Sequence, residues 1–396
     1  MLTRRTLLAA SAGAATLSLP VFAFGQAQAT DKRLLVLILR GGMDGLSAVA
    51  PVGDPSYAAL RGRLALPRSG EGAALGLDDT FALHPNLPKM QALYRAGELL
   101  PIHACATAYR ERSHFDAQNV LETGASAPFA RSEGWLNKAL GALPRARPEM
   151  GVALSAQAPL ILRGPTPVAT WSPSGLPDVD TDTISRLLAL YDARDPALAH
   201  ALESAMSANL VAMDSGALDM TGRGGRNVVA TAQIAARFLK DTNGPIAAVM
   251  ETTGWDTHAN QGLEQGPLAR NLAQLDNGLD AFKSEMGAEW SNTVVLIATE
   301  FGRTAAPNGG NGTDHGIASA AFLAGGAVNG GRVLADWPGL SQRDLYEGRD
   351  LRPTLDLRAV FKGVLADHLQ ISHAALERDV FPDSASIAPR RDLIRG

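Results

Sequence analysis

The chain has 396 residues, of which 46% are apolar and 19% charged, and its formal net charge is −4. Because it carries no excess of basic residues and no basic block, the sequence argues against nucleic acid as a partner. The single cysteine, Cys105, excludes an intramolecular disulfide, and its apolar neighbours predict a small buried side chain.

The first 29 residues predict an export signal of the twin-arginine type. The pattern Thr-Arg-Arg-x-Leu-Leu places Arg4 and Arg5 before a mildly apolar run, residues 7–24, and Ala27-Gln28-Ala29 then offers a small-x-small cleavage site. The run is too short and too rich in small residues for a comfortable membrane span. We therefore expect recognition by the twin-arginine export machinery, cleavage near Thr30, a periplasmic or secreted protein, and no stable membrane span after cleavage. An uncleaved anchor is the alternative.

The remaining chain predicts an α/β fold. Short apolar runs without alternation are typical of strands that are buried on both faces, and here they alternate with helix signals. The expected strands are 34–39, 99–104, 246–251, 293–298 and 320–324. The expected helices are 87–96, 182–191, 196–213, one that begins near Pro267 and one that begins at Pro353. We predict a mainly parallel sheet covered by helices on both faces, in one domain over 30–396 with a helical insertion near 180–240.

Acidic residues and histidines gather where the expected strands end. In chain order they are Asp44, His114 with Asp116, Asp256 with His258, Glu300, and Asp314 with His315. In a parallel sheet, ligands bind beyond the carboxyl ends of the strands, so these segments are expected to converge. Carboxylates and imidazoles from separate loops are what a hydrolytic metal site needs. Imidazoles suit zinc, and carboxylates also suit magnesium, calcium or manganese.

Six motifs give the sequence a family resemblance that covers residues 34 to 382. They are GGMDG, HPNLPKM, RSHFDAQ, GWDTH, TEFGR and TDHG, and in this order they resemble the DUF1501 family. That family is similar to distant members of the alkaline phosphatase superfamily, which includes sulfatases and metal-dependent phosphomutases. The resemblance implies an alkaline phosphatase-like fold, a two-metal site, and a serine or threonine nucleophile at a helix start.

The resemblance also implies roles for particular residues. Asp44 matches the metal-binding aspartate after the first strand, and Ser113 stands where the superfamily places its nucleophile. The metal ligands implied are Asp44, Asp256, His258, Glu300, Asp314 and His315. Two departures are visible, because Asp-x-His replaces Asp-x-x-x-His, and Glu-Phe replaces Asp-His. His114 is a further candidate ligand that would fill the gap, as would Asp314; otherwise the second metal is absent. Arg303 is expected to hold an anionic substrate.

These residues predict an exported, metal-dependent hydrolase of phosphate or sulfate esters that acts on a small anionic ester. The alternative is a non-catalytic relative that binds metal or an anion in a cell-envelope assembly. Structural roles also remain open: Asp44 as a turn cap, Ser113 as a helix cap, and Glu300 as the salt-bridge partner of Arg303. A serine hydrolase that pairs Ser113 with His114 is disfavoured, because adjacent side chains point apart and no Gly-x-Ser-x-Gly elbow is present.

Overall fold

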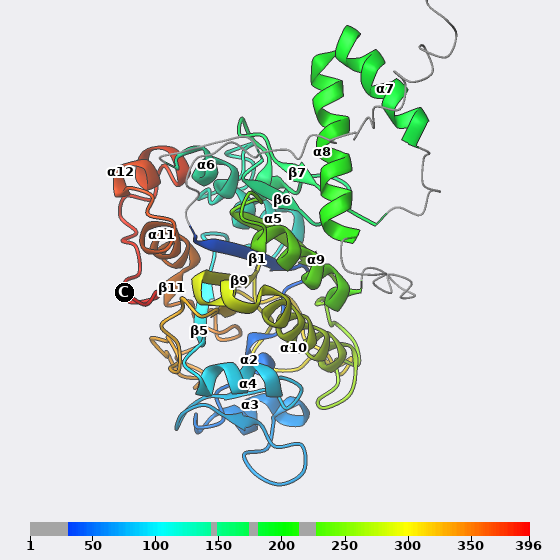
Figure 1. Cartoon of the computed structure of the whole chain (residues 1–396). Helices are drawn as coiled ribbons and strands as arrows, with labels where there is room; N and C mark the ends of the chain where they lie inside the picture. Colours follow the sequence, from blue (N-terminus) through cyan, green and yellow to red (C-terminus); the bar gives the residue numbers. More distant parts are fainter. Residues whose placement is uncertain (1–30, 144–148, 174–180, 214–226) are drawn as a thin grey trace, which may run out of the picture.

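The computed structural model describes residues 31–143, 149–173, 181–213 and 227–396 (Figure 1). The export signal lies outside the described residues, so its type stays a prediction. The centre is an eight-stranded sheet in the order β11-β5-β10-β9-β1-β8-β6-β7. Its strands are β1 Arg33–Leu39, β5 Leu99–Ala106, β6 Gly151–Ala153, β7 Ala169–Thr170, β8 Ala247–Thr252, β9 Thr293–Thr299, β10 Ser319–Ala324 and β11 Leu355–Asp356. Strand β10 runs antiparallel to β5 and β9, whereas the other described pairings in this sheet are parallel.

Helices surround this sheet. They are α2 Gly45–Ala48, α3 Tyr57–Arg61, α4 Pro88–Arg95, α5 His114–Thr123, α6 Trp135–Gly141, α7 Thr181–Arg194, α8 Pro196–Met213, α9 Val228–Lys240, α10 Pro267–Met286, α11 Leu357–Asp367 and α12 His373–Ala375. A small antiparallel sheet joins β2 Val49–Ala50, β4 Ala82–Leu83 and β3 Leu75–Gly76.

Both faces of the large sheet are covered by helices. Every residue of β1 is buried, and its side chains alternate between two cores. Leu35, Leu37 and Leu39 share a core with α4, α9 and α10. The intervening residues of β1 share the other core with α6 and α11. The predicted α/β fold, with a mainly parallel sheet and helices on both faces, is confirmed.

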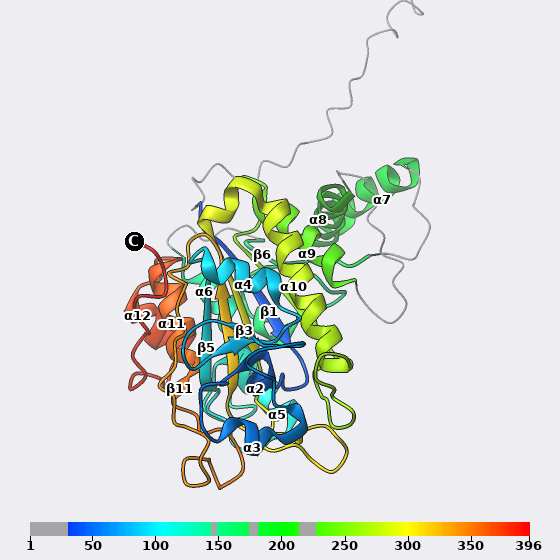
Figure 2. The same cartoon turned by 90° about the horizontal axis from the view of Figure 1, so that it is seen from below.

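One detail differs from the prediction. The last long helix begins at Leu357 and not at Pro353, because residues 355–356 first form β11, and the Asp356 side chain then accepts from the Arg358 amide. Within the segment 180–240, α7 and α8 project from the body, whereas α9 packs against α10 and the sheet (Figures 1 and 2). The projecting part is therefore the pair α7 and α8.

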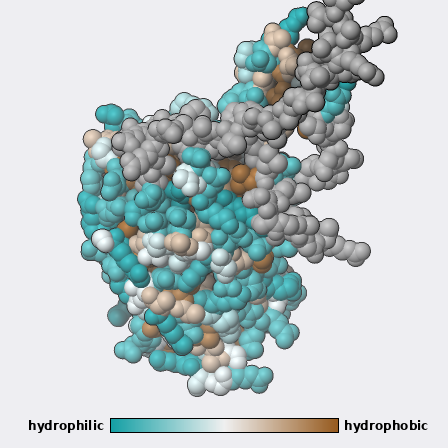
Figure 3. All heavy atoms as spheres, viewed as in Figure 1, coloured by the Kyte–Doolittle hydropathy of each residue, from teal (hydrophilic) through white to brown (hydrophobic). Residues whose placement is uncertain are grey.

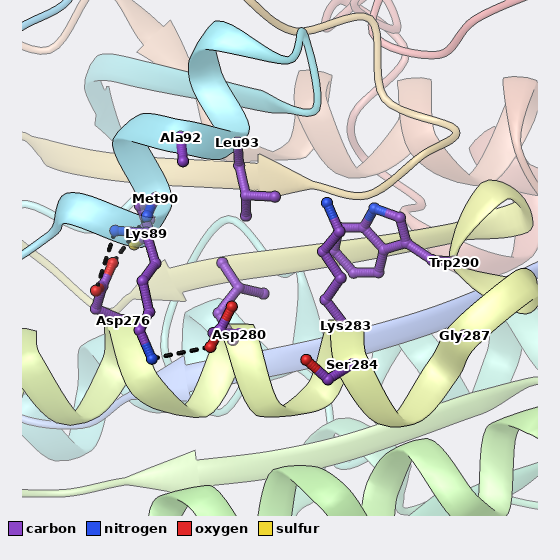
Figure 4. Close-up of a pocket in the computed structure, with 11 residues that line it drawn as sticks. Lys89, Met90, Ala92, Leu93, Asp276, Asp280, Lys283, Ser284, Gly287 and Trp290 are labelled. Carbon is purple, nitrogen blue, oxygen red and sulfur yellow. Dashed lines mark hydrogen bonds and ion pairs between the residues drawn. The ribbon is translucent and has the colours of Figure 1, made fainter.

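The contact between α4 and α10 shows how the helical layer is fixed. Leu87 precedes α4 and cannot cap it with a side chain, so the buried Asp276 of α10 accepts from the Lys89 amide at 3.2 Å and the Met90 amide at 2.8 Å (Figure 4). Burial raises the pKa of Asp276. Lys89 also pairs with Asp280 at 2.8 Å. These contacts make the shallow hollow between α4 and α10 part of the scaffold.

The face drawn in Figure 3 is mainly hydrophilic, with only scattered apolar spots. Cys105 is buried, as expected, and burial raises its thiol pKa to about 12. Within the described ranges, no helix combines the length and the apolar character needed to cross a bilayer.

Two buried histidines predict acid sensitivity of the fold. His103 and His368 are fully buried, and burial lowers the pKa of each to about 4 from an ordinary 6.5. His368 donates from Nε2 to the Arg33 carbonyl at 2.9 Å, and its Nδ1 has no hydrogen-bond partner in the described part of the chain. The unfolded chain therefore binds more protons between pH 6.5 and 4. Stability is present above pH 6.5 and is lost as the pH falls through about 4.

We expect each of these histidines to cost about 3 kcal/mol of unfolding free energy across this pH range. Urea titrations of the protein and of His368→Gln at several pH values measure this effect. The variant should show a shallower pH dependence, and equal slopes for the two proteins would contradict the assignment.

Candidate metal centre

The segments expected to carry the site meet at one edge of the sheet. Strands β1, β5, β8 and β9 run in the same direction, so the loops that follow them lie at their common carboxyl edge. Because β10 runs the opposite way, the residues before it, Asp314 and His315, reach that edge as well. Figure 2 shows α2 and α5, which begin just beyond β1 and the β5 loop, at this end. The structure thus brings five separated segments together.

Three imidazoles surround the carboxylate of Asp256. The Nε2 atoms of His258 and His315 lie 3.0 Å and 3.2 Å from its Oδ1, and the Nε2 of His114 lies 3.4 Å from its Oδ2. The Nε2 atoms of His258 and His315 are 2.9 Å apart. Among the described residues, His114, Asp256 and His315 form a group whose ligand atoms lie within 4.8 Å of one another. We call these four residues the His–Asp cluster.

Each ring of the cluster is held by a hydrogen bond from its other nitrogen. The Nδ1 acceptors are Glu300 for His114 at 2.8 Å, Asp314 for His258 at 3.1 Å, and the Arg112 carbonyl for His315 at 2.9 Å. Carboxylates and carbonyls only accept, so each ring donates from Nδ1 and turns its Nε2 toward Asp256, where a neutral ring is able to bind a metal ion. Among the described residues, the buried Nε2 of His114 makes no regular hydrogen bond, and the Asp256 carboxylate lies 3.4 Å away. A ring oriented from behind in this way is the usual arrangement of a metal-binding histidine.

This donor set fits a divalent metal ion. The Nε2 atoms of His258 and His315 lie 2.9 Å apart beside the Asp256 carboxylate, so a cation bound at this point would be held by both rings and by the carboxylate. Burial alone would raise the pKa of Asp256, but the hydrogen bond and charge of Arg303 lower it. Burial and the positive neighbours His114 and Arg303 lower the pKa of His315. Both groups thus favour the form that binds metal. Three nitrogens and a carboxylate suit zinc, manganese and similar ions.

Arg303 holds Asp256 in place. Its side chain is fully buried, and NH1 donates to Asp256 Oδ1 at 2.6 Å. Its other nitrogens donate to the hydroxyl and the carbonyl of Thr313, and NH1 also reaches the Gly41 carbonyl. The sequence left a salt bridge between Glu300 and Arg303 as an alternative. That alternative is wrong, because Arg303 pairs with Asp256. Binding of an anionic substrate by Arg303 stays a prediction. Each guanidinium nitrogen of Arg303 already donates to a protein atom.

Glu300 stands behind the cluster and not within it. The carboxylate is fully buried and accepts from His114 Nδ1, from the Gly41 amide at 2.8 Å and from Gln118 at 3.2 Å. The hydrogen bond to Glu300 raises the pKa of His114 although burial opposes it. Gly41 has φ +123°, and a Cβ there would lie 2.6 Å from the Asp256 amide, so the first glycine of the GGMDG motif allows this close approach.

Asp44 is not brought into the His–Asp cluster. Its buried carboxylate pairs with Arg61, accepts from Ser47 at 2.8 Å and from Gln261 at 2.7 Å, and caps α2 through the Leu46 amide. Burial opposes ionisation, but Arg61 and these hydrogen bonds lower the pKa of Asp44. This arrangement agrees with the alternative that the sequence left open, in which Asp44 caps the turn after the first strand. Gln261 connects the network to the site, since its Oε1 accepts from Thr313, the residue that holds Arg303.

Ser113 directly precedes α5 and does not cap it with its side chain. Its hydroxyl interacts with the phenol of Tyr109, which donates to Asp116 at 2.9 Å. The half-buried Ser113 therefore directly precedes the cluster residue His114 in the chain. Its hydroxyl makes no capping hydrogen bond to the helix. The sequence left open that Ser113 only caps the helix, and the structure does not show this cap.

Three contributors were missed by reasoning from the sequence. Phe301 packs against the rings of His114 and His315, with ring centres 4.8 Å and 4.9 Å away. Asn308 donates to Asp314 at 2.9 Å, and this bond lowers the pKa of Asp314. The Arg112 carbonyl is a backbone atom that no residue type signals. The position of Phe301, where the superfamily usually has a histidine, was the only available hint of its place in the site.

Comparisons with known proteins give one match over most of the chain and several distant likenesses. The family model described as "Protein of unknown function (DUF1501)" matches residues 31–381. No curated protein matches the sequence. Three solved structures with similar folds are the C-terminal periplasmic domain of EcEptC from Escherichia coli in complex with Zn, the phosphonate monoester hydrolase of Agrobacterium radiobacter, and the PsFucS1 sulfatase from Pseudoalteromonas sp..

These likenesses are remote. The identities are 10%, 11% and 12%, and the TM-scores are 0.35, 0.37 and 0.34. The alignments cover 76%, 86% and 77% of this chain and 74%, 74% and 64% of the three others.

Proposed function

The chain belongs to the DUF1501 family, and we propose that it is an exported, metal-dependent hydrolase of phosphate or sulfate esters that holds one divalent ion per chain. One observation carries the proposal. Three histidines direct their Nε2 atoms at the carboxylate of Asp256, and each is oriented by an acceptor behind it. The proposed ligands are His114, Asp256, His258 and His315. Glu300, Asp314 and Arg303 position them.

The proposed reaction uses groups beside the cluster. A divalent ion held there would supply Lewis acidity toward an ester oxygen. Ser113 Oγ forms a bond to phosphorus or sulfur, the bond to the alcohol oxygen breaks, and the alcohol leaves with a proton. Water then releases the phosphate or sulfate and restores the serine hydroxyl. The amides at the start of α5 favour negative charge at this position, and Tyr109 with Asp116 lies next to the Ser113 hydroxyl.

The coordination number favours a second candidate, a metal-binding relative without catalysis. Four protein ligands would fill a tetrahedral site, as in structural zinc centres, whereas catalytic centres keep a position open. Solvent access favours a catalytic centre, because the side chains of Asp256 and His258 are 41% and 45% exposed. A centre with one solvent-facing side leaves room for a substrate oxygen, so we favour the hydrolase.

Replacing Ser113 tests the hydrolase directly. If its hydroxyl is the nucleophile, Ser113→Ala should lower kcat at least about 1000-fold while metal content and unfolding temperature stay unchanged. The measurement uses 4-nitrophenyl phosphate and 4-nitrophenyl sulfate with the metal-loaded protein. Ser56 is a matched control, since it also precedes a helix without capping it by its side chain. Full activity in Ser113→Ala would remove the nucleophile. A metal-loaded protein that cleaves neither ester would favour the non-catalytic candidate.

The export proposal has its own test. The double substitution Arg4→Lys with Arg5→Lys should leave the precursor in the cytoplasm, because the twin-arginine route requires the arginine pair. Cell fractionation locates the protein, and N-terminal sequencing of the exported form should begin near Thr30. Undiminished export of the double variant would contradict this route.

A further inference from the structure

A cleft of about 640 Å³ lies along α5, and two exposed phenylalanines line it. The side chains of Phe115 and Phe129 are 83% and 70% exposed, more than any other large hydrophobic side chain in the described residues. Polar side chains complete the lining, among them Gln118, Gln157 and Arg163. Large aromatic side chains left in water beside a concave polar surface are typical of a binding site.

The backbone at Phe129 supports this interpretation independently. Phe129 has φ +55°, a left-handed conformation that is unfavourable for a bulky residue. The buried Asn119 of α5 holds it there, because its Oδ1 accepts from the Phe129 amide at 2.7 Å. Burial of the ring does not offset this strain, because Phe129 is 70% exposed. Residues held in strained backbone conformations cluster at active sites and ligand sites.

The walls of the cleft are tied to the His–Asp cluster. Phe115 directly follows His114 on α5, and Gln118, one turn further, donates to Glu300 behind that histidine. Arg40, which also lines the cleft, precedes Gly41, whose amide donates to Glu300 as well. The cleft therefore runs along α5, the helix that Ser113 directly precedes, and its lining is bonded to the carboxylate that orients His114.

The charges of the cleft do not select an anion. Arg40 pairs with Glu122 at 2.9 Å and also with Glu251, so its positive charge is balanced by two carboxylates. The cleft is also larger than a phosphate or sulfate group needs. Its features suit a neutral ring that stacks a face on phenylalanine and offers hydroxyl groups to amide, guanidinium and carboxylate groups.

We propose that this cleft binds the alcohol part of the ester, and that this alcohol carries a ring that stacks on Phe115 and Phe129. The shared chemistry is a flat or sugar ring bearing hydroxyls, supplied by a phenol or by a sugar. The inference rests on the proposed function, since it names the substrate class of the same site.

The kinetic test compares three esters with the metal-loaded protein: phenyl phosphate, glucose 6-phosphate and methyl phosphate. Phe115→Ala and Phe129→Ala should each lower kcat/KM about tenfold for a ring-bearing ester and leave methyl phosphate unchanged. A loss confined to phenyl phosphate identifies a phenol, and a loss confined to glucose 6-phosphate identifies a sugar. Leu190→Ala is the control, because Leu190 is also exposed but lies on α7. Equal losses on all three esters, or no loss on any, would overturn the proposal.

A binding measurement separates this inference from the proposed function. Saturation-transfer NMR with phenol and with methyl glucoside needs no turnover and is carried out on metal-depleted protein. Binding of either compound that is lost in the Phe115→Ala, Phe129→Ala double variant supports the cleft, even if the protein hydrolyses nothing. No binding to the unsubstituted protein, or equal binding to the double variant, would overturn the cleft even if the protein is an active hydrolase.

Discussion

Replacing His258 by alanine should weaken binding of a divalent metal more than about 100-fold, because it removes an imidazole from the His–Asp cluster, and even an outer partner of a metal ligand is worth 10- to 100-fold. The ring is 45% exposed and contributes little packing, so the metal-free variant should unfold at the same temperature as the metal-free protein. At a metal concentration 100 times the dissociation constant, only the unsubstituted protein should gain about 2.7 kcal/mol.

Calorimetric titration gives the affinities, and thermal unfolding with and without chelator gives the stabilities. His373→Ala is the control, since His373 is an exposed histidine on α12. A variant that keeps the metal affinity of the unsubstituted protein would remove His258 from the ligand set. A variant that is already destabilised without metal would show that the ring acts through packing.

Replacing Glu300 should separate its contribution to folding stability from its contribution to metal binding through His114. In Glu300→Ala the Gly41 amide, His114 Nδ1 and Gln118 lose a buried acceptor, so we expect a loss of about 3 kcal/mol or more in unfolding free energy even without metal. Glu300→Gln keeps an acceptor oxygen but removes the charge behind His114. It should keep most of the stability and weaken metal binding about 10- to 100-fold.

Urea unfolding of the metal-free proteins measures the first effect, and metal titration measures the second. Glu133→Gln is the control, because Glu133 is a carboxylate with a 44% exposed side chain that pairs with Lys138 of α6. Unchanged metal affinity in Glu300→Gln would show that the charge behind His114 does not tune the centre. A stable Glu300→Ala would show that the buried donors find other acceptors.

Sequence patterns predicted the architecture because the controlling signal is local. The unbroken apolar run of β1 indicated a strand buried on both faces, and its alternate residues do enter two separate cores. Convergence at one edge followed from parallel strands alone. Even the exception agrees with this reasoning, since antiparallel β10 begins at the edge where the parallel strands end.

The division of labour within the site could not be predicted in the same way. Glu300 and Asp256 are both carboxylates that follow strands, and one hydrogen bond separates a residue in the cluster from a residue behind it. Asp44 shows a related difficulty. Its place depends on Arg61, a residue from α3 that belongs to none of the motifs, and the pairing of the two is buried. Residue type indicates which side chains are able to bind metal, whereas packing decides which of them face the same point.

The metal content of the purified mature protein tests the central claim most directly. Elemental analysis by mass spectrometry, after dialysis against excess zinc or manganese and removal of the unbound ion, gives the stoichiometry. The His–Asp cluster predicts one ion per chain, and none in a protein in which His114, His258 and His315 are all replaced by alanine. An unsubstituted protein that retains no ion, or a triple variant that retains as much as the unsubstituted protein, would contradict it.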